Sequence, residues 1–454
     1  MRRSLFLCLL VAGCSPPAPD DPLPTEIEVP RADCDVDAPD ATVGLRRCTD
    51  EAEAGYALFT PFADPTTYLL DPLGNVVHSW SGERLSGMST YLLDDGTLLR
   101  ATNLPPSSSF VDGASRGGGL EVRSWDGGLL WETTFADDTV FRHHDVEALP
   151  DGTVLVIAYE YKTRAEALAV GRDPELLVGD ALWPDFLLRY DPAADEVVWE
   201  WHLWDHLIQD RDPSLPNYGS VAENPGRVDI NAVTFETPGS DGADWNHMNS
   251  VSWDPVRDEI LMTSHAQGEI WVIDADGDSD LRWRWGKDPL FDGPADGVLV
   301  GPHDAHRIPE GLPGAGDVLV FDNNGGDEGR SVLRQVAPAM AGDDYARQGS
   351  AWAPADDVWS YEAEGFASFF ASGLQRLRSG NTWVTEAATG RMFEITPAGD
   401  VVWEYVNPVT INGILADGEV PAPQANALFK TVKLRPGHPA LVDRDLVSQG
   451  PLTE

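Results

Sequence analysis

The sequence predicts an all-β fold, a six-bladed β-propeller of four-stranded antiparallel blades that follows an N-terminal signal and linker. Three observations predict it: a turn-and-strand pattern that occurs six times, a second such pattern that accompanies most copies, and the composition. The 454 residues include 16 Trp, 43 Gly and 35 Pro. This composition suits many short strands and tight turns better than a helical bundle.

The first pattern is a turn rich in Asp, Pro and Gly, followed by a short apolar run that ends in aromatic residues. Its copies are DPLGNVVHSW (71–80), SWDGGLLWET (124–133), DPAADEVVWEW (191–201), DADGDSDLRWRW (274–285), APADDVWSYE (353–362) and TPAGDVVWEY (396–405). We expect the tryptophans, and His78 at a tryptophan position, to pack between blades. The segment DADGDSD is interpreted as a solvated turn rather than a calcium loop, because it lacks the terminal glutamate.

The second pattern is an apolar residue, a turn with glycine and a strand. It occurs at LLDDGTLL (92–99), LPDGTVLVI (149–157), IPEGLPGAGDVLVF (308–321) and LRSGNTWVT (377–385). Each unit thus supplies several short strands joined by hairpins, with no convincing helical periodicity between them. Tandem four-stranded sheets at such spacing are typical of a propeller. Long loops such as 161–185 and 205–243 are expected to lie on one face, where propellers usually bind ligands.

The N-terminus, MRRSLFLCLLVAGC, has two arginines, a short apolar run and small residues before Cys14. It is too short to span a bilayer and has the features of a signal peptide. Its end resembles a bacterial lipobox, which predicts a lipoprotein signal peptide over residues 1–13 and a lipidated Cys14. An ordinary secretory signal with a chance cysteine is the alternative. We expect an exported protein, lipid-anchored to the bacterial cell envelope on the periplasmic or cell-surface face.

The remaining segments are predicted to be a Pro-rich acidic linker (14–50), the propeller (51–440) and a C-terminal tail (441–454). Beyond the signal and Cys14, the cysteines are Cys34 and Cys48, and in an oxidising compartment we expect them to pair. The formal net charge of −44 would repel nucleic acid, so no nucleic-acid partner is expected. The sequence leaves the oligomeric state open.

Four histidines occupy related places in the repeats. PHDAHRIPEG (302–311) aligns without a gap to HHDVEALPDG (143–152), so that His303 and His144 are equivalent. DWNHMNSVSWD (244–254) adds His247, and His265 follows in the next strand-turn segment. Because equivalent strand positions of successive blades converge on the axis of a propeller, we expect these four rings, from three blades, to face one small volume.

Two chemistries fit such a cluster. Neutral imidazoles are ordinary ligands of zinc, copper and iron, so the histidines could hold a transition metal. Alternatively they could bind an oxyanion, with one imidazole as nucleophile and protonated neighbours stabilising the transferred charge.

From about residue 55 to 435 the chain also resembles the bacterial arylsulfotransferases, which are exported six-bladed propellers. The resemblance rests on segments 244–274, 301–324 and 366–408, with a Trp-x-His-x-Asn and a His-Asp-Ala motif. It implies an aryl-sulfate sulfotransferase that moves a sulfuryl group from a phenolic sulfate ester to a phenol. The expected partners are small phenols and aryl sulfates. No cofactor is expected, neither the nucleotide donor PAPS nor a metal, and no GxxxxGK[ST] phosphate loop occurs in the chain.

The resemblance also implies the roles of individual residues. His303 corresponds to the nucleophile, which forms a sulfohistidine in a ping-pong reaction, and His247 and Asn249 correspond to the pair that contacts the sulfate. His144 corresponds to a third catalytic histidine, with His143 as the second choice for that position. The other candidates near the substrate are His143, His265, Asp304 and His306.

The chain departs from the family at two places. Where better-studied members carry an arginine, this chain reads Met262-Thr263-Ser264-His265, and His265 is expected to replace the arginine's charge in a pH-dependent way. Pro302 stands before the nucleophile, where a glutamine is expected. These departures keep a second hypothesis open, that the protein is a non-catalytic exported propeller that binds a ligand or a protein partner.

Overall fold

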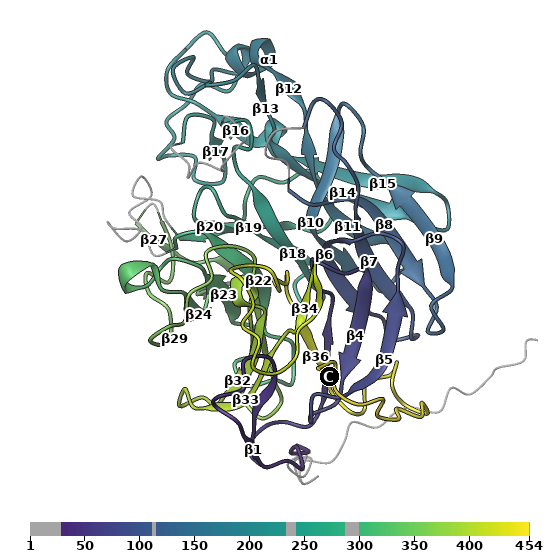
Figure 1. The fold of residues 1–454 in the computed structure, drawn as a ribbon. Coiled ribbons are helices and arrows are strands. Elements are labelled where there is room, and N and C mark those ends of the chain that lie inside the picture. The colour runs from purple at the N-terminus through teal and green to yellow at the C-terminus, as the bar shows by residue number, and fades with distance from the viewer. Residues whose placement is uncertain (1–28, 111–114, 233–241, 287–298, 350, 454) are drawn as a thin grey trace, which may run out of the picture.

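The computed structural model describes residues 29–110, 115–232, 242–286, 299–349 and 351–453. Within these ranges the chain forms five four-stranded antiparallel sheets and one six-stranded sheet, besides short two-stranded ladders. The sheets are the blades of a propeller, as Figure 1 shows. The predicted fold class is therefore confirmed. The predicted signal peptide and Cys14 lie outside the described residues.

Each blade is built from strands that follow one another in the chain, except that the inner strand of blade 1 comes from near the C-terminus. Blades 1 to 3 comprise β36 (Val432–Leu434), β3 (Tyr56–Phe59), β4 (Thr66–Leu70) and β5 (Val76–Ser81); β6 (Ser86–Leu92), β7 (Leu98–Asn103), β8 (Gly118–Arg123) and β9 (Leu129–Thr134); and β10 (Val140–Ala148), β11 (Val154–Glu160), β14 (Asp185–Asp191) and β15 (Glu196–His202).

Blades 4 to 6 repeat this order, with the first strand innermost. They comprise β18 (Met248–Asp254), β19 (Glu259–Ser264), β20 (Glu269–Asp274) and β21 (Trp283–Gly286); β22 (Pro302–Arg307), β23 (Val318–Asp322), β24 (Val332–Val336) and β29 (Trp359–Tyr361); and β30 (Gly373–Arg376), β31 (Thr382–Glu386), β32 (Arg391–Ile395) and β33 (Val401–Val406). The inner strand β10 contacts β6 and β18, and β22 contacts β18 and β30, so the blades follow chain order around the axis.

Both sequence patterns mark turns of the blades. The first pattern lies between the third and fourth strands of every blade, and the second lies between the first and second strands. In the turn after β4, Asp71 Oδ1 accepts hydrogen bonds from the backbone N–H groups of Leu73 and Asn75, both at 2.9 Å. Gly74 supplies the positive φ of 76° that the turn requires. Because the residues of these turns can be recognised in the sequence, the six blades could be counted from it.

The aromatic ends of the first pattern pack between blades, as expected. Trp80, Trp201 and Trp283 are almost fully buried. His78 stacks on Trp125, with ring centroids 4.1 Å apart, and its Nε2 donates to the Trp125 carbonyl oxygen at 2.9 Å. These side chains fill the space between neighbouring sheets and leave the inner strands to line the axis.

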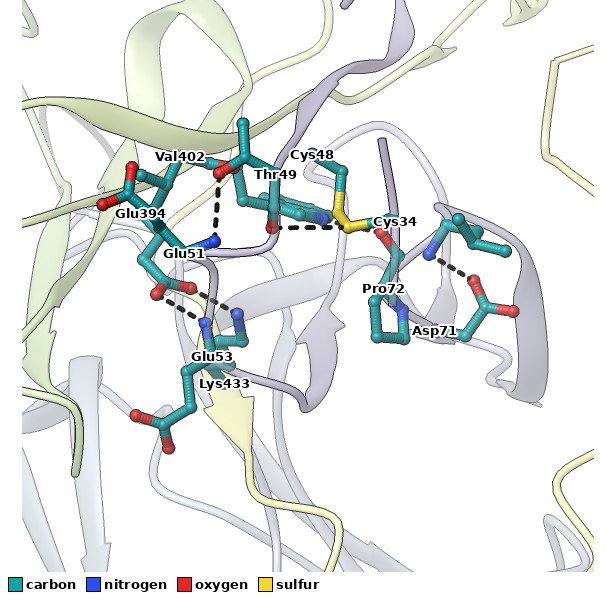
Figure 2. The surroundings of a disulfide bond; sticks show 12 residues. Cys34, Cys48, Thr49, Glu51, Glu53, Asp71, Pro72, Glu394, Val402 and Lys433 are labelled. Carbon is teal, nitrogen blue, oxygen red and sulfur yellow. Dashed lines mark hydrogen bonds and ion pairs between the residues drawn. A yellow bond between two sulfur atoms is a disulfide. The ribbon is translucent and has the colours of Figure 1, made fainter. Parts of the chain in front are cut away.

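Part of the segment predicted as linker belongs to the propeller. The strands β1 (Val36–Asp37) and β2 (Gly44–Cys48) extend blade 6 outward, where β2 pairs with β33. Cys34 and Cys48 form a disulfide with a Cα–Cα distance of 5.6 Å (Figure 2). The buried Cys48 side chain packs in an apolar cluster with side chains of blade 6. This packing makes the segment part of the folded domain rather than part of the linker. Such disulfides are typical of oxidising compartments.

The predicted tail also packs on a blade. The Gln449 N–H donates to Val76 O at 2.8 Å, and the Val76 N–H donates to Gly450 O at 2.9 Å, so residues 449 and 450 run beside β5. The first blade is thus closed on two sides by C-terminal chain, by β36 and by this segment. Ring closure by chain ends pairs residues that are remote in sequence.

The long loops expected on one face gather there, at the top of Figure 1. They contain β12 (Lys162–Thr163), β13 (Ala181–Leu182), β16 (Leu207–Ile208), β17 (Val228–Asp229) and the helix α1 (Arg164–Ala169). Thr163 and Glu166 form a capping box at the start of α1, which is too short to show helical periodicity in the sequence. No helix of the described residues is long and apolar enough to span a bilayer.

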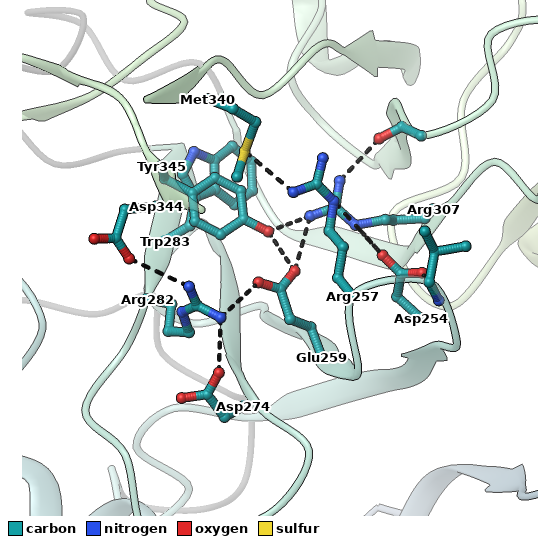
Figure 3. Close-up of polar contacts among 12 residues, drawn as sticks. Asp254, Arg257, Glu259, Asp274, Arg282, Trp283, Arg307, Met340, Asp344 and Tyr345 are labelled. Atoms are coloured by element: carbon teal, nitrogen blue, oxygen red, sulfur yellow. Dashed lines mark hydrogen bonds and ion pairs between the residues drawn. The ribbon is translucent and has the colours of Figure 1, made fainter. Parts of the chain in front are cut away.

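A buried ionic cluster anchors β22 at its end remote from these loops (Figure 3). Arg307 lies 2.7 Å from Asp254 Oδ2 and 3.1 Å from Glu259 Oε2, which both belong to blade 4. Tyr345 donates to Glu259 Oε2 at 2.5 Å. Blades 4 and 5 are therefore fixed relative to each other, and with them the side chains at the other end of β22.

Candidate active site

The four predicted histidines meet at one end of the inner strands. Ring centroids are 4.6 Å apart for His144 and His247, 5.2 Å for His247 and His265, and 5.3 Å for His265 and His303. His144 and His303, which are equivalent in the repeat, are 6.5 Å apart. The expected convergence is thus present in the structure, on the face that carries the long loops.

The backbone at these histidines is held in a conformation that few non-glycine residues adopt. His144 and His247 have φ values of 51° and 47°, and Asp304 beside His303 has 57°. The register of each inner strand shifts at these points. The Arg142 side chain secures one of them by donating to the carbonyl oxygens of His144 at 2.6 Å and Gly87 at 2.7 Å. Such strain persists where packing enforces it, and it clusters at functional sites.

The His303 imidazole is oriented by an asparagine. Its Nδ1 lies 2.7 Å from Asn323 Oδ1, and the Asn323 amide donates to Ser368 O at 2.6 Å and Ala371 O at 3.0 Å. Because both carbonyls must face the amide N–H₂ group, the Asn323 oxygen faces His303 and accepts its Nδ1–H. The lone pair of His303 therefore lies on Nε2. Burial lowers the pKa of His303 to about 3, which keeps this imidazole neutral.

His247 is supported by a carboxylate that sequence reasoning missed. Its Nδ1 is hydrogen-bonded to Asp244 Oδ2, which also accepts from the Tyr159 hydroxyl at 3.0 Å. Asp244 is nearly fully buried. The signal was present in the sequence, since Asp244 stands three residues before His247.

His143 lies behind His144 rather than beside the other rings. Its Nδ1 is 2.7 Å from His144 Nδ1, its Nε2 is 2.7 Å from Asp185 Oδ1, and its ring stacks on Tyr159 at 3.6 Å. Burial lowers the pKa of His143 well below its usual range, so the ring is neutral. With Nε2–H donated to Asp185, its Nδ1 accepts the Nδ1–H of His144. This arrangement leaves a lone pair on His144 Nε2.

Three predicted substrate contacts are bound to the protein itself. Asn249 donates to Pro302 O at 2.9 Å and accepts from the Thr263 hydroxyl. Asp304 Oδ2 accepts from the Leu374 N–H at 2.9 Å. His306 Nδ1 donates to the carbonyl oxygen of Asp304 at 2.9 Å. These groups position β22 and its surroundings, a role that the sequence pattern does not distinguish from substrate contact.

An ion cluster on the axis was not foreseen. The Lys430 ammonium lies 2.7 Å from Asp145 Oδ2 and 2.9 Å from Asp304 Oδ1, and Tyr91 donates to Asp145 Oδ1 at 2.7 Å. Lys430 precedes Gly437 by the same seven residues that separate Asp145 from Gly152 and Asp304 from Gly311. Equivalent positions of blades 1, 3 and 5 therefore meet across the axis. In the sequence, Lys430, Asp145 and Asp304 directly follow Phe429, His144 and His303.

The remaining side of the site is apolar. Phe429 is 6.0 Å from the His144 ring and belongs to a cluster with Phe62, Met88 and Phe370, and Phe62 stacks on Phe370 at 6.5 Å. Met88 and Phe429 occupy the repeat position of His144 in blades 2 and 1. An aromatic ring could pack here with a polar substituent directed at the histidines.

The imidazoles of His144, His265 and His303 carry little positive charge when the site is empty. Burial lowers the pKa of His144 and His265 well below their usual range, with the neighbouring histidines adding to the effect. The sequence-based expectation of protonated imidazoles thus requires a bound anion. Within the described ranges, no three His, Cys, Asp or Glu side chains are arranged to hold a metal ion.

We expect sulfate binding to take up a proton. The His144, His265 and His303 imidazoles are neutral in the empty site, because burial lowers their pKa values, and a bound oxyanion raises these pKa values by favouring the charged form. Affinity for inorganic sulfate should therefore fall as the pH rises from about 6 to 8, by up to about tenfold per unit for one proton. Calorimetry in two buffers of different ionisation enthalpy measures the proton uptake. An affinity that is constant over this range would contradict the expectation.

Comparison with known proteins bears on the whole site. A family model described as Arylsulfotransferase (ASST) matches residues 127–408, more than half of the chain. The curated proteins include no significant match.

Solved structures similar to this chain include a protein of unknown function from Bacteroides caccae, with 13% sequence identity and a TM-score of 0.46 over 84% of this chain and 100% of that chain. A protein from Lactobacillus plantarum has 8% identity and a TM-score of 0.44, with coverage of 84% and 100%. A putative 6-phosphogluconolactonase from Bacteroides fragilis has 10% identity and a TM-score of 0.41, with coverage of 84% and 98%.

Proposed function

The chain belongs to the arylsulfotransferase family, and from this membership we propose that it moves a sulfuryl group from a phenolic sulfate ester to a phenol through a sulfohistidine at His303, without PAPS. The observation that carries the proposal is the hydrogen bond from His303 Nδ1 to Asn323. It places the free lone pair of a neutral imidazole on Nε2, beside three further imidazoles. A nucleophile needs this protonation state, and a neutral ring at ordinary pH supplies it.

In the first half-reaction, His303 Nε2 attacks the sulfur atom of the donor. The bond between sulfur and the phenolic oxygen breaks, and the electron pair leaves with that oxygen, which takes the proton that His144 Nε2 acquires when the anionic donor binds. His247, supported by Asp244, and His265 lie on either side of the transferred group and stabilise its oxygens as hydrogen-bond donors. Lys430 and its carboxylate partners keep the strands of His144 and His303 in fixed relation.

In the second half-reaction, the oxygen of the acceptor phenol attacks the sulfur atom of sulfohistidine. His144 Nε2, now carrying a lone pair, takes the phenolic proton, and the bond between sulfur and His303 Nε2 breaks to restore the neutral ring. His143 and Asp185 hold His144 in the tautomer that this step requires. The proton that left His144 in the first step thus returns in the second.

The apolar cluster supports aromatic rather than aliphatic substrates. Phe62, Met88, Phe370 and Phe429 offer flat apolar surface next to His144. Both half-reactions use the same surface, because donor and acceptor each carry an aromatic ring on the reacting oxygen.

The proposal is tested with 4-nitrophenyl sulfate as donor and an added phenol as acceptor. We expect release of 4-nitrophenol that depends on the acceptor, with initial rates that give parallel double-reciprocal lines, the sign of a ping-pong reaction. Absence of turnover with every phenol, in protein shown to be folded, would favour the binding propeller instead. Intersecting lines would exclude the covalent intermediate while leaving the transferase activity.

A further inference from the structure

Arg116 is a partly buried arginine for which the described part of the chain offers no ion-pair partner. Its Nη1 donates to the Phe62 carbonyl oxygen at 3.1 Å, and its guanidinium lies 4.9 Å from the centroid of the Phe62 ring. Other buried arginines, such as Arg100 and Arg334, contact carboxylates at 2.7 Å. Arg142 and Arg172 likewise lack a carboxylate partner, but each donates to carbonyl oxygens through both terminal nitrogens, whereas Arg116 donates through Nη1 alone among the contacts of the described residues. A cation held in this way retains its capacity to bind an anion.

The backbone around Arg116 lies against the candidate active site. Ser115 Oγ is 3.4 Å from the Tyr159 hydroxyl, which in turn bonds to Asp244 beside His247. Gly117 pairs with His143, and a Cβ atom at Gly117 would collide with Arg142 O, so the chain is pressed onto β10 here. Residues 115–117 are therefore held at the site, and the Arg116 side chain extends from them toward Phe62.

The side chain ends at the apolar cluster. Phe62, over which the guanidinium lies, stacks on Phe370 and belongs to the cluster of Met88 and Phe429. Arg116 comes from blade 2, whereas His303 comes from blade 5, and these blades face each other across the axis of a six-bladed ring. An aromatic ring packed on the cluster would thus have the histidines at one end and Arg116 at the other.

We propose that Arg116 binds an oxyanion, such as a carboxylate, carried by the aromatic substrate at the end remote from its phenolic oxygen. The proposal rests on the proposed function, because it takes the aryl group to lie on the apolar cluster. It narrows the proposed substrates to phenols that carry an acidic substituent. The net charge of −44 repels such anions from the protein as a whole, so a dedicated cation is needed to select them. Guanidinium matches a carboxylate with two parallel hydrogen bonds.

Direct binding tests this assignment independently of turnover. The probes are 4-hydroxyphenylacetate and its uncharged methyl ester, titrated calorimetrically into wild type and Arg116→Met. We expect wild type to prefer the acid, and Arg116→Met to bind the acid about 10- to 100-fold more weakly while its affinity for the ester stays the same, as loss of a charge-assisted hydrogen bond implies. Arg116→Lys should restore part of the preference.

Arg164→Met is the matched control. Arg164 also binds backbone carbonyl oxygens through its guanidinium, those of Leu177 and Gly179, but it lies on α1 in the long loops. Its replacement removes the same charge and should change neither affinity. If both substitutions weakened binding of the acid equally, the loss of affinity would be due to the change in overall charge, and the proposal would be overturned.

Two further outcomes separate this inference from the proposed function. A preference for the acid that depends on Arg116, in a protein without transferase activity, would support the inference and defeat the function. Active protein in which Arg116→Met raises KM for the aryl sulfate donor, but not for the acidic acceptor, would place Arg116 at the sulfuryl group and overturn the inference. Wild type that binds acid and ester equally, or neither of them, would also overturn it.

Discussion

His303→Ala is expected to lower kcat with an aryl sulfate donor and a phenol by at least about a thousand-fold, because it removes the proposed nucleophile. The fold should be unchanged, since β22 is held at its other end by Arg307 and beside the site by Asn249. Steady-state rates together with circular dichroism measure both effects.

His306→Ala is the matched control for this variant. It lies on the same strand, and its Nδ1 bonds only to the carbonyl of its neighbour Asp304 among the contacts described. Its kcat should stay within about threefold of wild type, the range typical of sites away from the chemistry. Added imidazole should restore part of the activity of His303→Gly. Full activity of His303→Ala would assign the nucleophile to another group.

Lys430→Met is expected to lower the free energy of unfolding by about 3–5 kcal/mol, the usual cost of leaving a buried charge without its partner. Asp145 and Asp304 would then face each other across the axis with no cation between them, and neither carboxylate has appreciable solvent access. Chemical denaturation measures the change. Because Asp304 and Asp145 are next to His303 and His144, turnover should fall with stability.

Removal of the two carboxylates that would be left without a cation provides a second test of this prediction. Lys430→Met combined with Asp145→Asn and Asp304→Asn should recover much of the lost stability, since no buried charge then remains in the cluster. Arg47→Met breaks an exposed ion pair with Asp37 and should cost less than about 1 kcal/mol. A triple variant as unstable as Lys430→Met would show that packing of the lysine stem, rather than charge pairing, holds the axis together.

The sequence predicted those parts of the fold that depend on local chemistry. Turns such as Asp71 to Asn75 are specified by their own residues, so the blades could be counted. Ring closure was not predictable, because β36 pairs with β3 across nearly the whole chain and shares no turn with it. The strand β2 was hidden for the same reason, since its partner β33 lies more than 350 residues away.

The candidate site divides in the same way. His144 and His303 could be found because repeats place equivalent residues at equivalent positions around an axis. Lys430 and Arg116 act through contacts between blades, which no local pattern encodes. Asn323 orients His303 within one blade, but the carbonyl oxygens that fix its own orientation come from the segment before β30. Asp304 was predicted to lie near the substrate, and in the structure its carboxylate binds Lys430. The residue type and the repeat position of Asp304 do not specify which neighbouring group pairs with this carboxylate.

The central claim, that His303 carries the sulfuryl group between two phenols, is tested most directly by trapping. Protein mixed with 4-nitrophenyl sulfate without an acceptor is quenched, digested under alkaline conditions and analysed by mass spectrometry. We expect the peptide that contains His303 to gain one SO₃ group in nearly stoichiometric amount, and to lose it when a phenol is added before quenching. Turnover without any modified peptide, or with the group on another residue, would contradict the mechanism.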